Sequence, residues 1–540
     1  MSAAGSSSQA SKVTRRAGVV MVGTLGSRIL GALRDAVIAA LFPLRATDAF
    51  FVAFTIPNTF RAVLAEGALS GVLVPSFSQA QKCIDLQERK QRIAAVSGLM
   101  LMLLVLVTVL GVWLSRPLAY AYAAGHAGDR DKLELIVTLT RLLFPYLLLM
   151  GVVALATAAL HVRQRFAWAA AAPMLLNLSL ITLPWLLLDT YPTPLYAIRG
   201  LVWAVLVGGV LHAFLLLWRV YRCGAWVWPT WPWRHPQSAQ VLRALVPIAA
   251  GFLLYQGNIM LTRMYASFLP DGAQSFLYYS QRIVEIPQGL FALSLATASL
   301  PSLTRLAQAQ QFDQAGRLCA ASLRMALFLA LPAAVCLLVA AEDVIALVLG
   351  RGRFDASAVA KTGECLRWMA LSVGGVALNR GLVPLFYARG DTRTPMIGTG
   401  VNVVVFALMG GVGMQLMAHA GIALGTSIAA LAQLGVLLWR AEGQGLCIPW
   451  RRLWAGVWRM LLASLAMALA MLFCQWLFRH AYDGYASLWL RLFAVLVAGG
   501  MSYALSVWAL RLSEWQSLLS RWPARQPSRV VDTKGDHADS

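Results

Sequence analysis

Charged residues are scarce in this chain of 540 residues: 13% are Asp, Glu, Lys or Arg, whereas 59% are hydrophobic. A soluble domain carries about 25% charged residues, so a soluble fold is excluded. Apolar runs long enough to cross a bilayer, each about 20 residues, recur from residue 17 to residue 511. One membrane domain therefore fills nearly the whole chain.

Catalytic and nucleotide-binding motifs are also missing. The sequence has no GxxxxGKS or GxxxxGKT phosphate loop, no GxSxG elbow and no HExxH zinc motif. Its seven cysteines are scattered without a CxxC pair, so we expect free thiols, no disulfide framework and no metal site. No cofactor is expected, although coupling to the membrane potential or to ions stays open.

Basic residues exceed acidic ones by 45 to 23, which gives a net charge of +22. We nevertheless expect no nucleic-acid partner, because the Lys and Arg residues concentrate in short loops between apolar spans and such loops orient membrane proteins. An even number of spans with both termini in the cytoplasm is predicted. The loops then predicted to be cytoplasmic carry Lys82 to Arg92, Arg163 and Arg165, Arg219 to Arg243, Arg389 and Arg393, and Arg451 and Arg452.

The apolar runs predict an all-α polytopic membrane protein with about fourteen transmembrane helices. The expected divisions are a disordered basic tail over 1–16, an N-lobe of helices 1–6 over 17–222, a tryptophan-rich cytoplasmic connector over 223–240, a C-lobe of helices 7–12 over 241–445, helices 13–14 over 446–511, and a cytoplasmic tail over 512–540.

An internal repeat relates the two lobes. VPSFSQAQ (74–81) resembles LPSLTRLAQAQ (300–310), and Pro75 and Pro301 are 226 positions apart. The same shift relates Arg163 in HVRQRF to Arg389 in YARGDTR. Because the shift covers six spans, the two lobes have the same orientation and form a parallel repeat. Secondary transporters with such repeats bind substrate near the midplane, between the repeats.

Four arginines lie inside predicted spans, and each would cost roughly 2.5 to 3.5 kcal/mol at the membrane centre unless it faced water or a partner. They are Arg28 and Arg34 in the first helix, Arg61 in the second, and Arg282 in the eighth. Carboxylates nearby are expected to position them or, in a purely structural alternative, to neutralise them: Asp35, Asp48, Glu66 and Glu285. One guanidinium group can donate two parallel hydrogen bonds to two phosphate oxygens, so the cluster predicts a phosphate-bearing or otherwise anionic substrate.

Helix breakers accompany these arginines. Pro57 and Asn58 precede Arg61, Pro75 ends the second helix, and Pro287 follows Glu285. Proline removes a backbone donor and kinks a helix, so these positions predict hinges or bends that line a cavity. Four further arginines are instead expected near helix ends, with their side chains reaching the membrane surface: Arg141, Arg263, Arg324 and Arg380.

Several stretches resemble one family. SRILGALRDAVIAALF (27–42), ATDAFFVAFTIPNTFRAVLAEGALSGVLVPSF (46–77), YYSQRIVEIPQGLFALSLATASLPSL (278–303) and FYARGDTRTP (386–395) are similar to the MurJ/MviN family of lipid II flippases. The resemblance extends over about residues 17–510.

The resemblance implies the multidrug/oligosaccharidyl-lipid/polysaccharide exporter fold, with two six-helix lobes and a final helix pair that forms a groove for a polyprenyl tail. It implies a non-enzymatic flippase of the bacterial inner membrane that moves the undecaprenyl-diphosphate-linked peptidoglycan precursor lipid II to the periplasmic leaflet by alternating access. Arg28, Arg34, Arg61 and Arg282 would bind the diphosphate and sugar head. Membrane lipids and the cell-wall synthesis machinery are further partners that it implies.

Two positions depart from the family pattern. Many members have Asp before the eighth-helix arginine, where this chain has Gln281, and the seventh helix has Asn258 but no acid. A sodium site of the kind described in some members is therefore not expected.

Other functions stay open from the residues alone. They are an exporter of another lipid-linked oligosaccharide, a polyprenyl-phosphate-dependent glycosyltransferase, and a scaffold that transports nothing. A cationic-drug antiporter is disfavoured by the arginines, and a glycosyltransferase would need acidic residues in large external loops, whereas these loops are short.

Overall fold

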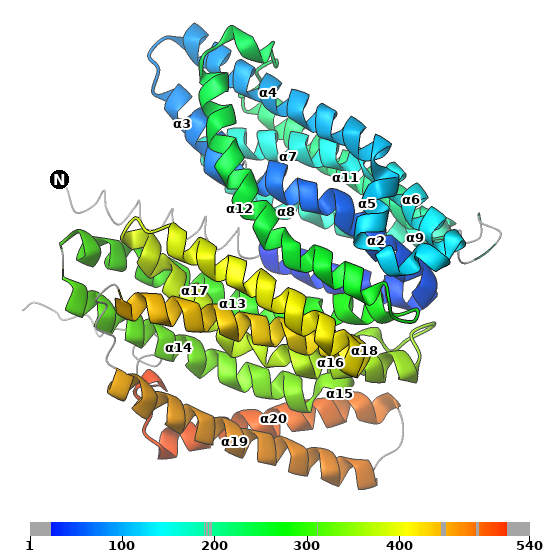
Figure 1. Cartoon of the computed structure of the whole chain (residues 1–540), viewed down its shortest axis with the longest axis vertical. Helices are drawn as coiled ribbons and strands as arrows, with labels where there is room; N and C mark the ends of the chain where they lie inside the picture. The colour runs from blue at the N-terminus through cyan, green and yellow to red at the C-terminus, as the bar shows by residue number, and fades with distance from the viewer. Residues whose placement is uncertain are drawn as a thin grey trace, which may run out of the picture.

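The computed structural model describes residues 23–515, apart from residues 68, 188–189, 191–192, 194–196, 310, 444–449 and 482–484. The predicted tail over 1–16 and most of the tail over 512–540 lie outside the described residues. Figure 1 shows long helices side by side in two stacked bundles, with a further helix pair packed below them. The predicted all-α membrane fold is confirmed.

The first bundle, blue to cyan in Figure 1, is called the N-lobe below. It comprises helical residues 23–41, α2 (Leu44–Arg61), the π-helical η1 (Ala62–Gly67) and η2 (Leu69–Leu73), α3 (Val74–Gln81), α4 (Leu86–Trp113), α5 (Ser115–Tyr122), η3 (Ala124–Gly128), α6 (Arg130–Leu143), α7 (Pro145–Val162), α8 (Phe166–Ala171), α9 (Pro173–Leu187) and α11 (Arg199–Arg222).

The second bundle, green to yellow, is called the C-lobe. The short η5 (Pro232–Arg234) precedes α12 (Gln237–Ala266), which contacts both α4 of the N-lobe and α18 of the C-lobe. The remaining helices are α13 (Ala273–Gln308), α14 (Phe312–Val339), α15 (Ala341–Leu349), α16 (Ala356–Ala370), α17 (Ser372–Ala388) and α18 (Arg393–Gly443), followed by the separate pair α19 (Trp450–Ala481) and α20 (Tyr485–Ala509).

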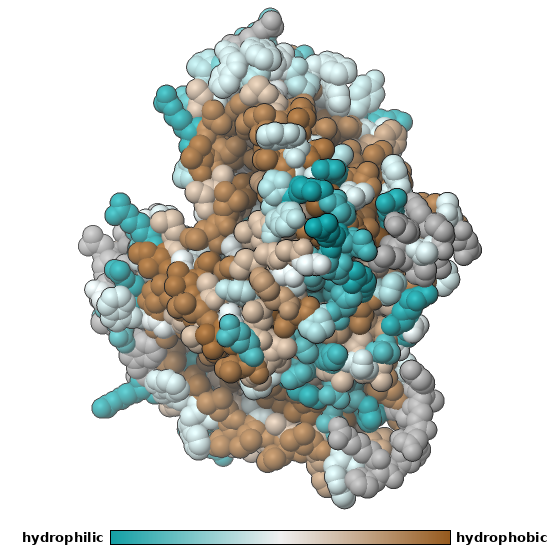
Figure 2. All heavy atoms as spheres, turned by 45° about the vertical axis from the view of Figure 1, so that its right-hand side comes forward, coloured by the Kyte–Doolittle hydropathy of each residue, from teal (hydrophilic) through white to brown (hydrophobic). Residues whose placement is uncertain are grey.

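Eleven helices among the described residues are long and apolar enough to cross a membrane. The 51-residue α18 is one of them, and it loses helical geometry at Met417 and Ala418, between the predicted eleventh and twelfth helices. Figure 2 shows hydrophobic side chains over broad areas, with hydrophilic ones gathered toward the end that lies on the right in Figure 1. The described chain is therefore a multi-pass membrane protein, and the count of fourteen helices stays a prediction.

Helix boundaries repeat along the chain as the sequence predicts. Helix α4 begins at Leu86 and α14 begins at Phe312, 226 positions later, and their ends at Trp113 and Val339 differ by the same shift. The starts of α5 and α15, and of α6 and α16, are also 226 apart. The segments from α4 to α6 and from α14 to α16 therefore have the same succession of helices, as a parallel repeat requires.

The repeat-related helices α2 and α13 lie against each other and join the two lobes. Phe51 of α2 stacks on Tyr278 of α13, with ring centroids 3.9 Å apart, and meets Tyr279 edge to face. Both Phe51 and Tyr279 are buried. Aromatic packing of this kind contributes about 0.5 to 1.5 kcal/mol beyond the burial of apolar area. The midpoint of the molecule is thus a packed contact between α2 and α13.

The final helix pair is attached to the C-lobe by a buried polar contact. Asp343 of α15 pairs with Arg491 of α20 and accepts a hydrogen bond of 3.1 Å from Nε2 of Gln475 in α19. Asp343 is 7% exposed, so its charge depends on these two partners. The contact fixes both α19 and α20 to the same point of the C-lobe.

We predict that Asp343→Ala destabilises the protein, because it leaves the Arg491 guanidinium without its carboxylate in a largely buried place. Removing one partner of a buried ion pair costs about 3 to 5 kcal/mol. Thermal unfolding in detergent should show a clearly lower melting temperature. The matched control is Glu134→Ala, which breaks an ion pair with Arg116 whose side chains are both more than half exposed. That change should cost less than about 1 kcal/mol, and equal shifts for the two variants would contradict the prediction.

Candidate functional site

Arg34 and Asp35 form a buried ion pair within helical residues 23–41. The Nη2 and Nε atoms of Arg34 donate to Oδ1 of Asp35 at 2.7 and 2.9 Å. The Nη1 atom donates to Oδ1 of Asn177 in α9 at 3.0 Å, and Asn177 in turn donates to the Ser27 carbonyl at 2.9 Å. Sequence reasoning gave Asn177 no role, because an amide in an apolar helix has no signal until its partner is known.

Arg61 ends α2 and is held from both sides. Its Nε donates to Oδ1 of Asn58 at 2.7 Å, and its Nη1 lies 2.6 Å from Oε1 of Glu66. Residues five apart do not face each other on an α-helix, where neighbours are three or four apart. The chain is π-helical over Ala62–Gly67, and the wider turn brings Glu66 toward Arg61. The helix breakers predicted around Arg61 thus accompany a change of helix type that builds an ion pair.

Arg282 brings the C-lobe into the same site. Its Nη1 lies 3.2 Å from Oε2 of Glu285, and its Nε lies 3.8 Å from Oδ2 of Asp35. The charge of Arg282 also acts on both Arg34 and Arg61, which it repels. Guanidinium groups from three different helices therefore converge where the two lobes meet.

Two more arginines lie beside the next residues of α13. The guanidinium of Arg28 lies against Gly289, where an added Cβ would be 2.6 Å from Nη2. Arg380 of α17 donates from Nη1 to the Gln288 carbonyl at 2.6 Å. The expectation that Arg380 lies near a helix end and reaches the membrane surface is wrong, because it is in the middle of α17 and turns toward α13.

The charges of this group do not cancel. Arg34, Arg61 and Arg282 pair with three carboxylates, those of Asp35, Glu66 and Glu285, whereas Arg28 lies against Gly289 and Arg380 donates to a backbone carbonyl. The Arg282 and Glu285 side chains are each 46% exposed, so the site is not closed off by the protein. The arrangement can hold a ligand with about two negative charges while the carboxylates keep the guanidinium groups in place.

Asp48, predicted to support these arginines, lies elsewhere. It is 1% exposed and receives hydrogen bonds from the Gly272 amide at 2.6 Å and from the Ser275 amide at 2.9 Å and hydroxyl at 2.7 Å. Those amides are free at the start of α13, where the helix dipole favours a negative charge. Asp48 therefore caps a C-lobe helix from the N-lobe. It does not contact Arg61, because the two residues are more than three helical turns apart in α2.

Other charges join the lobes around Asp48, and we call the group the interlobe latch. Lys132 lies 2.6 Å from Oδ1 of Asp271 and 3.5 Å from Oδ2 of Asp48, while Arg45 bridges Asp271 at 3.2 Å and Asp129 at 2.6 Å. The chains also approach closely at Gly125, where an added Cβ would lie 2.4 Å from the Phe268 amide nitrogen. The two lobes are held together at this end of the molecule.

The remaining predictions for side chains in the spans have mixed outcomes. Arg263 lies in the last turn of α12, near a helix end as predicted, but it is buried and donates to the carbonyl of Gln274 at 3.2 Å. Arg324 lies 3.1 Å from the buried Glu514, and Arg141 donates to Ser115 at 2.8 Å. Helix α13 continues through Pro287. Pro75 is the second residue of α3, so the second helix does not end there, as predicted, but runs on to Gln81. The roles of Pro57, Pro75 and Pro287 as hinges stay predictions.

Asn258 takes part in a chain of amides within the C-lobe. It donates to Asn402 in α18, which donates to Gln433 at 3.1 Å. Among the described residues, no group of three or more His, Cys, Asp or Glu side chains is placed to hold a metal ion. The amides are thus linked in the place where the sequence offered no acid, while Oδ1 of Asn258 is buried and has no hydrogen-bond partner among the described residues.

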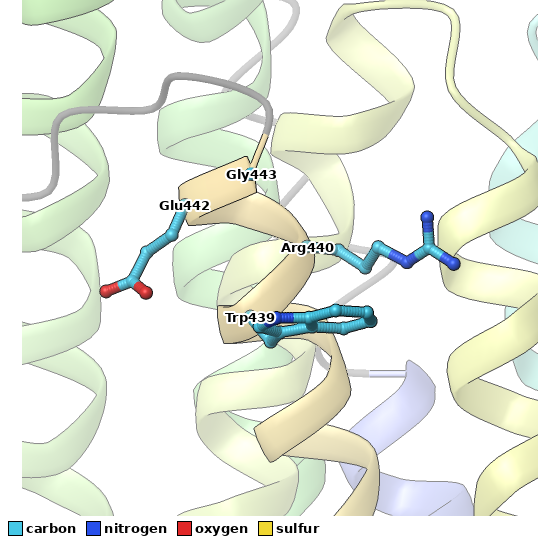
Figure 3. A pocket seen from close by; sticks show the side chains of 4 residues that line it. All are labelled: Trp439, Arg440, Glu442 and Gly443. Carbon is cyan, nitrogen blue, oxygen red and sulfur yellow. The ribbon is translucent and has the colours of Figure 1, made fainter.

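A separate hollow at the end of α18 does not share the features of the arginine site. Figure 3 shows Trp439 and Arg440 extending to one side of the helix and Glu442 to the other. Arg440 lies over the Trp439 ring, 5.1 Å from its centroid. The side chains do not converge on a common point, so we do not assign this hollow to the candidate site.

Sequence comparison finds close relatives of the chain. The family model described as "Lipid II flippase MurJ" matches residues 38–493, which include Arg61, Arg282 and Arg380 and exclude Arg28 and Arg34. A protein of Vibrio cholerae named "Probable lipid II flippase MurJ" is 31% identical over 462 residues, 84% of this chain and 87% of that protein. "Lipid II flippase MurJ" of Burkholderia cenocepacia is 32% identical over 432 residues, 79% of this chain and 83% of that protein.

Solved structures show the same fold. A structure titled "Lipid II flippase MurJ, inward closed conformation" superposes with a TM-score of 0.75 and 20% identity, covering 93% of this chain and 99% of that one. An inward-facing multidrug resistance MATE family transporter gives a TM-score of 0.63 at 14% identity, covering 78% and 95%. The predicted exporter fold, with two repeated lobes and a final helix pair, is therefore confirmed.

The interlobe latch should weaken in acid. His126 lies in η3, outside the spans, and burial together with the nearby Lys132 charge lowers its pKa from 6.5 to about 4. The closed latch therefore holds His126 neutral, whereas unfolded chains bind a proton below about pH 6.5. The contribution of neutral His126 to the free energy of unfolding is complete above about pH 6.5 and is lost as the pH falls toward 4.

The measurement is the melting temperature in detergent between pH 8 and pH 4. We expect it to fall below about pH 6.5, and we expect His126→Gln to remove part of that fall. His235→Gln, in the connector, is the matched control and should leave the pH profile of the wild type in place. A profile that His126→Gln does not alter would show that His126 is not the titrating group.

Proposed function

The chain belongs to the MurJ family of lipid II flippases, and we propose that it moves lipid II between the two leaflets of the membrane. The observation that carries this proposal is the group of five arginines at the meeting point of the lobes, which exceeds its carboxylates by two charges. Lipid II carries a diphosphate between its sugar head and its polyprenyl tail. Guanidinium groups bind such oxygens with paired hydrogen bonds, which lysine does not reproduce.

We assign individual arginines to the head group by their freedom to exchange partners. The Arg282 side chain is 46% exposed and lies 3.2 Å from Glu285 and 3.8 Å from Asp35. These contacts are longer than those of Arg34 and Arg61 with their carboxylates, so Arg282 is the best placed to turn to a ligand. Arg61 is tied more closely to Glu66, and Arg34 is buried against Asp35. Arg28 and Arg380 flank the same stretch of α13. Asp35, Glu66 and Glu285 keep the cluster assembled while the site is empty.

Alternating access follows from the position of the latch. The lobes are joined at the end that carries Asp48, Lys132 and Asp271, while the N-lobe and C-lobe helices diverge toward the opposite end in Figure 1. A head group bound by Arg282 and Arg34 bridges the lobes, and release on the other side requires the latch to open. Moving one charge across the membrane is worth about 2.3 kcal/mol per 100 mV, so the membrane potential is a sufficient source of energy.

The proposed location is the bacterial inner membrane with both termini in the cytoplasm. Support comes from the basic residues at one end of the N-lobe. Arg89 at the start of α4, Arg163 directly after α7 and Gly224 after α11 line one hollow, so these three places share one end of the N-lobe. The latch residues Arg45, Asp129 and Asp271 share the other end. Short basic loops favour the cytoplasmic side. Lipid II then enters from the basic end and leaves past the latch.

The proposal makes the chain a transporter and not an enzyme. The glycosyltransferase alternative and the other lipid-linked oligosaccharides receive no support from the relatives, whose names specify lipid II. Helices α19 and α20 offer the surface for the polyprenyl tail, and the cell-wall synthesis machinery and membrane lipids remain proposed partners.

We predict that Arg282→Ala abolishes most lipid II translocation when it replaces the wild-type chain in cells depleted of their own flippase. A hydrogen bond to a charged group contributes about 1.5 to 3 kcal/mol, so the loss should exceed about tenfold. Arg34→Ala should act similarly, and Arg282→Lys should be intermediate because it keeps the charge alone. The readout is labelling of lipid II exposed at the outer leaflet, with expression checked by immunoblot.

The control variant is Arg116→Ala, which removes an exposed arginine paired with Glu134 at the far end of the N-lobe. It should support wild-type labelling. If Arg282→Ala and Arg34→Ala both leave lipid II exposed at wild-type levels, the arginines serve the structure and the proposed role is wrong.

A further inference from the structure

A second basic hollow lies in the N-lobe, apart from the arginine site. It is lined by the ends of α3, α4 and α7 and by connector residues 224–227, and its cavity volume is about 90 Å³. Its basic side chains are Arg89, Lys90 and Arg163. These come from two separate segments that the fold brings to one place.

Within the part of the chain that the structure describes, no carboxylate lines this hollow. The two acids nearest in sequence have their own partners, since Asp85 caps the Gln87 amide at 2.8 Å and Glu88 pairs with Arg92. Among the described residues, Arg89 and Lys90 have no ion pair with a carboxylate. Arg163 donates only to backbone carbonyls, those of Cys223 and Gly224. Three positive charges therefore face the hollow without a compensating acid.

Apolar side chains also line the hollow, among them Phe77, Ile93, Val162 and Trp226. Trp226 packs edge to face with Trp228, which is 73% exposed, and the Thr230 amide fastens the connector to the Ala94 carbonyl at 3.2 Å. Tryptophan concentrates where a membrane protein crosses the level of lipid head groups. The hollow thus combines cations, an apolar wall and an interfacial position.

We propose that this hollow binds the phosphate of an anionic membrane phospholipid, whose acyl chains contact the apolar lining residues. A free phosphate ion would use the three cations but would gain nothing from Phe77, Ile93 and Trp226. Basic hollows between helices at the cytoplasmic side are typical sites for acidic lipid head groups. The site is independent of the arginine cluster, because none of its lining residues belongs to that cluster.

The test uses the full chain purified in detergent and titrated with phosphatidylglycerol, with bound lipid counted by native mass spectrometry. Arg89→Gln combined with Lys90→Gln should lower the affinity at least about fivefold, since each basic group near lipid phosphate contributes on the order of that factor. The control removes two charges from neighbouring loop positions outside the hollow, Lys82→Gln with Arg165→Gln, and should bind like the wild type. Phosphatidylcholine should bind much more weakly to all three proteins.

Three outcomes would overturn the proposal. They are equal loss in the test and control variants, unchanged phosphatidylglycerol binding in the test variant, and displacement of the lipid by inorganic phosphate at the same concentration. Melting temperatures show whether the double variant is folded, and if it is not, the exposed Lys90→Gln alone should still weaken phosphatidylglycerol and spare phosphatidylcholine.

Discussion

A guanidinium group within a membrane must find polar partners, and the arginines at the centre of this chain show how that requirement shapes the site. Arg34 uses a carboxylate and an amide, Arg61 uses an amide and a carboxylate five residues away, and Arg380 uses a backbone carbonyl. Each of these pairings constrains the helix that carries the arginine. The chain after Arg61 is π-helical, and this wider turn brings Glu66 within reach of the Arg61 guanidinium. The cost of burying charge thus fixes local geometry, and the excess of arginine leaves a preference for anions.

The same requirement explains how two repeated lobes become different at their contact. Helices α2 and α13 are repeat mates, yet α2 contributes Asp48 to the latch whereas α13 contributes the amides that Asp48 caps. The arginine cluster and the latch both lie across the lobe boundary, one within the spans and one at their end. Any ligand that changes the pairing of Arg282 therefore acts on the boundary that the latch also holds.

Much of this could be predicted from the sequence. Apolar runs fixed the helical class, and a shift of 226 residues predicted the repeat that the boundaries of α4 and α14 confirm. The convergence of Arg34, Arg61 and Arg282 was also expected. Asp48, Asn177 and Arg380 were not placed correctly, because their roles depend on partners about 90 to 230 residues away. Spacing along one helix reports which residues share a face, but it does not report what the opposite helix presents.

The central claim is that Arg282 recognises the diphosphate of lipid II, and its most direct test is a binding cycle with the purified chain. Affinity is measured for lipid II and for an analogue with a single phosphate, in the wild type and in Arg282→Ala. The account predicts that the wild type prefers the diphosphate by about tenfold or more and that Arg282→Ala loses most of this preference. If the variant binds both ligands more weakly but keeps the full preference, Arg282 does not contact the diphosphate and the account is contradicted.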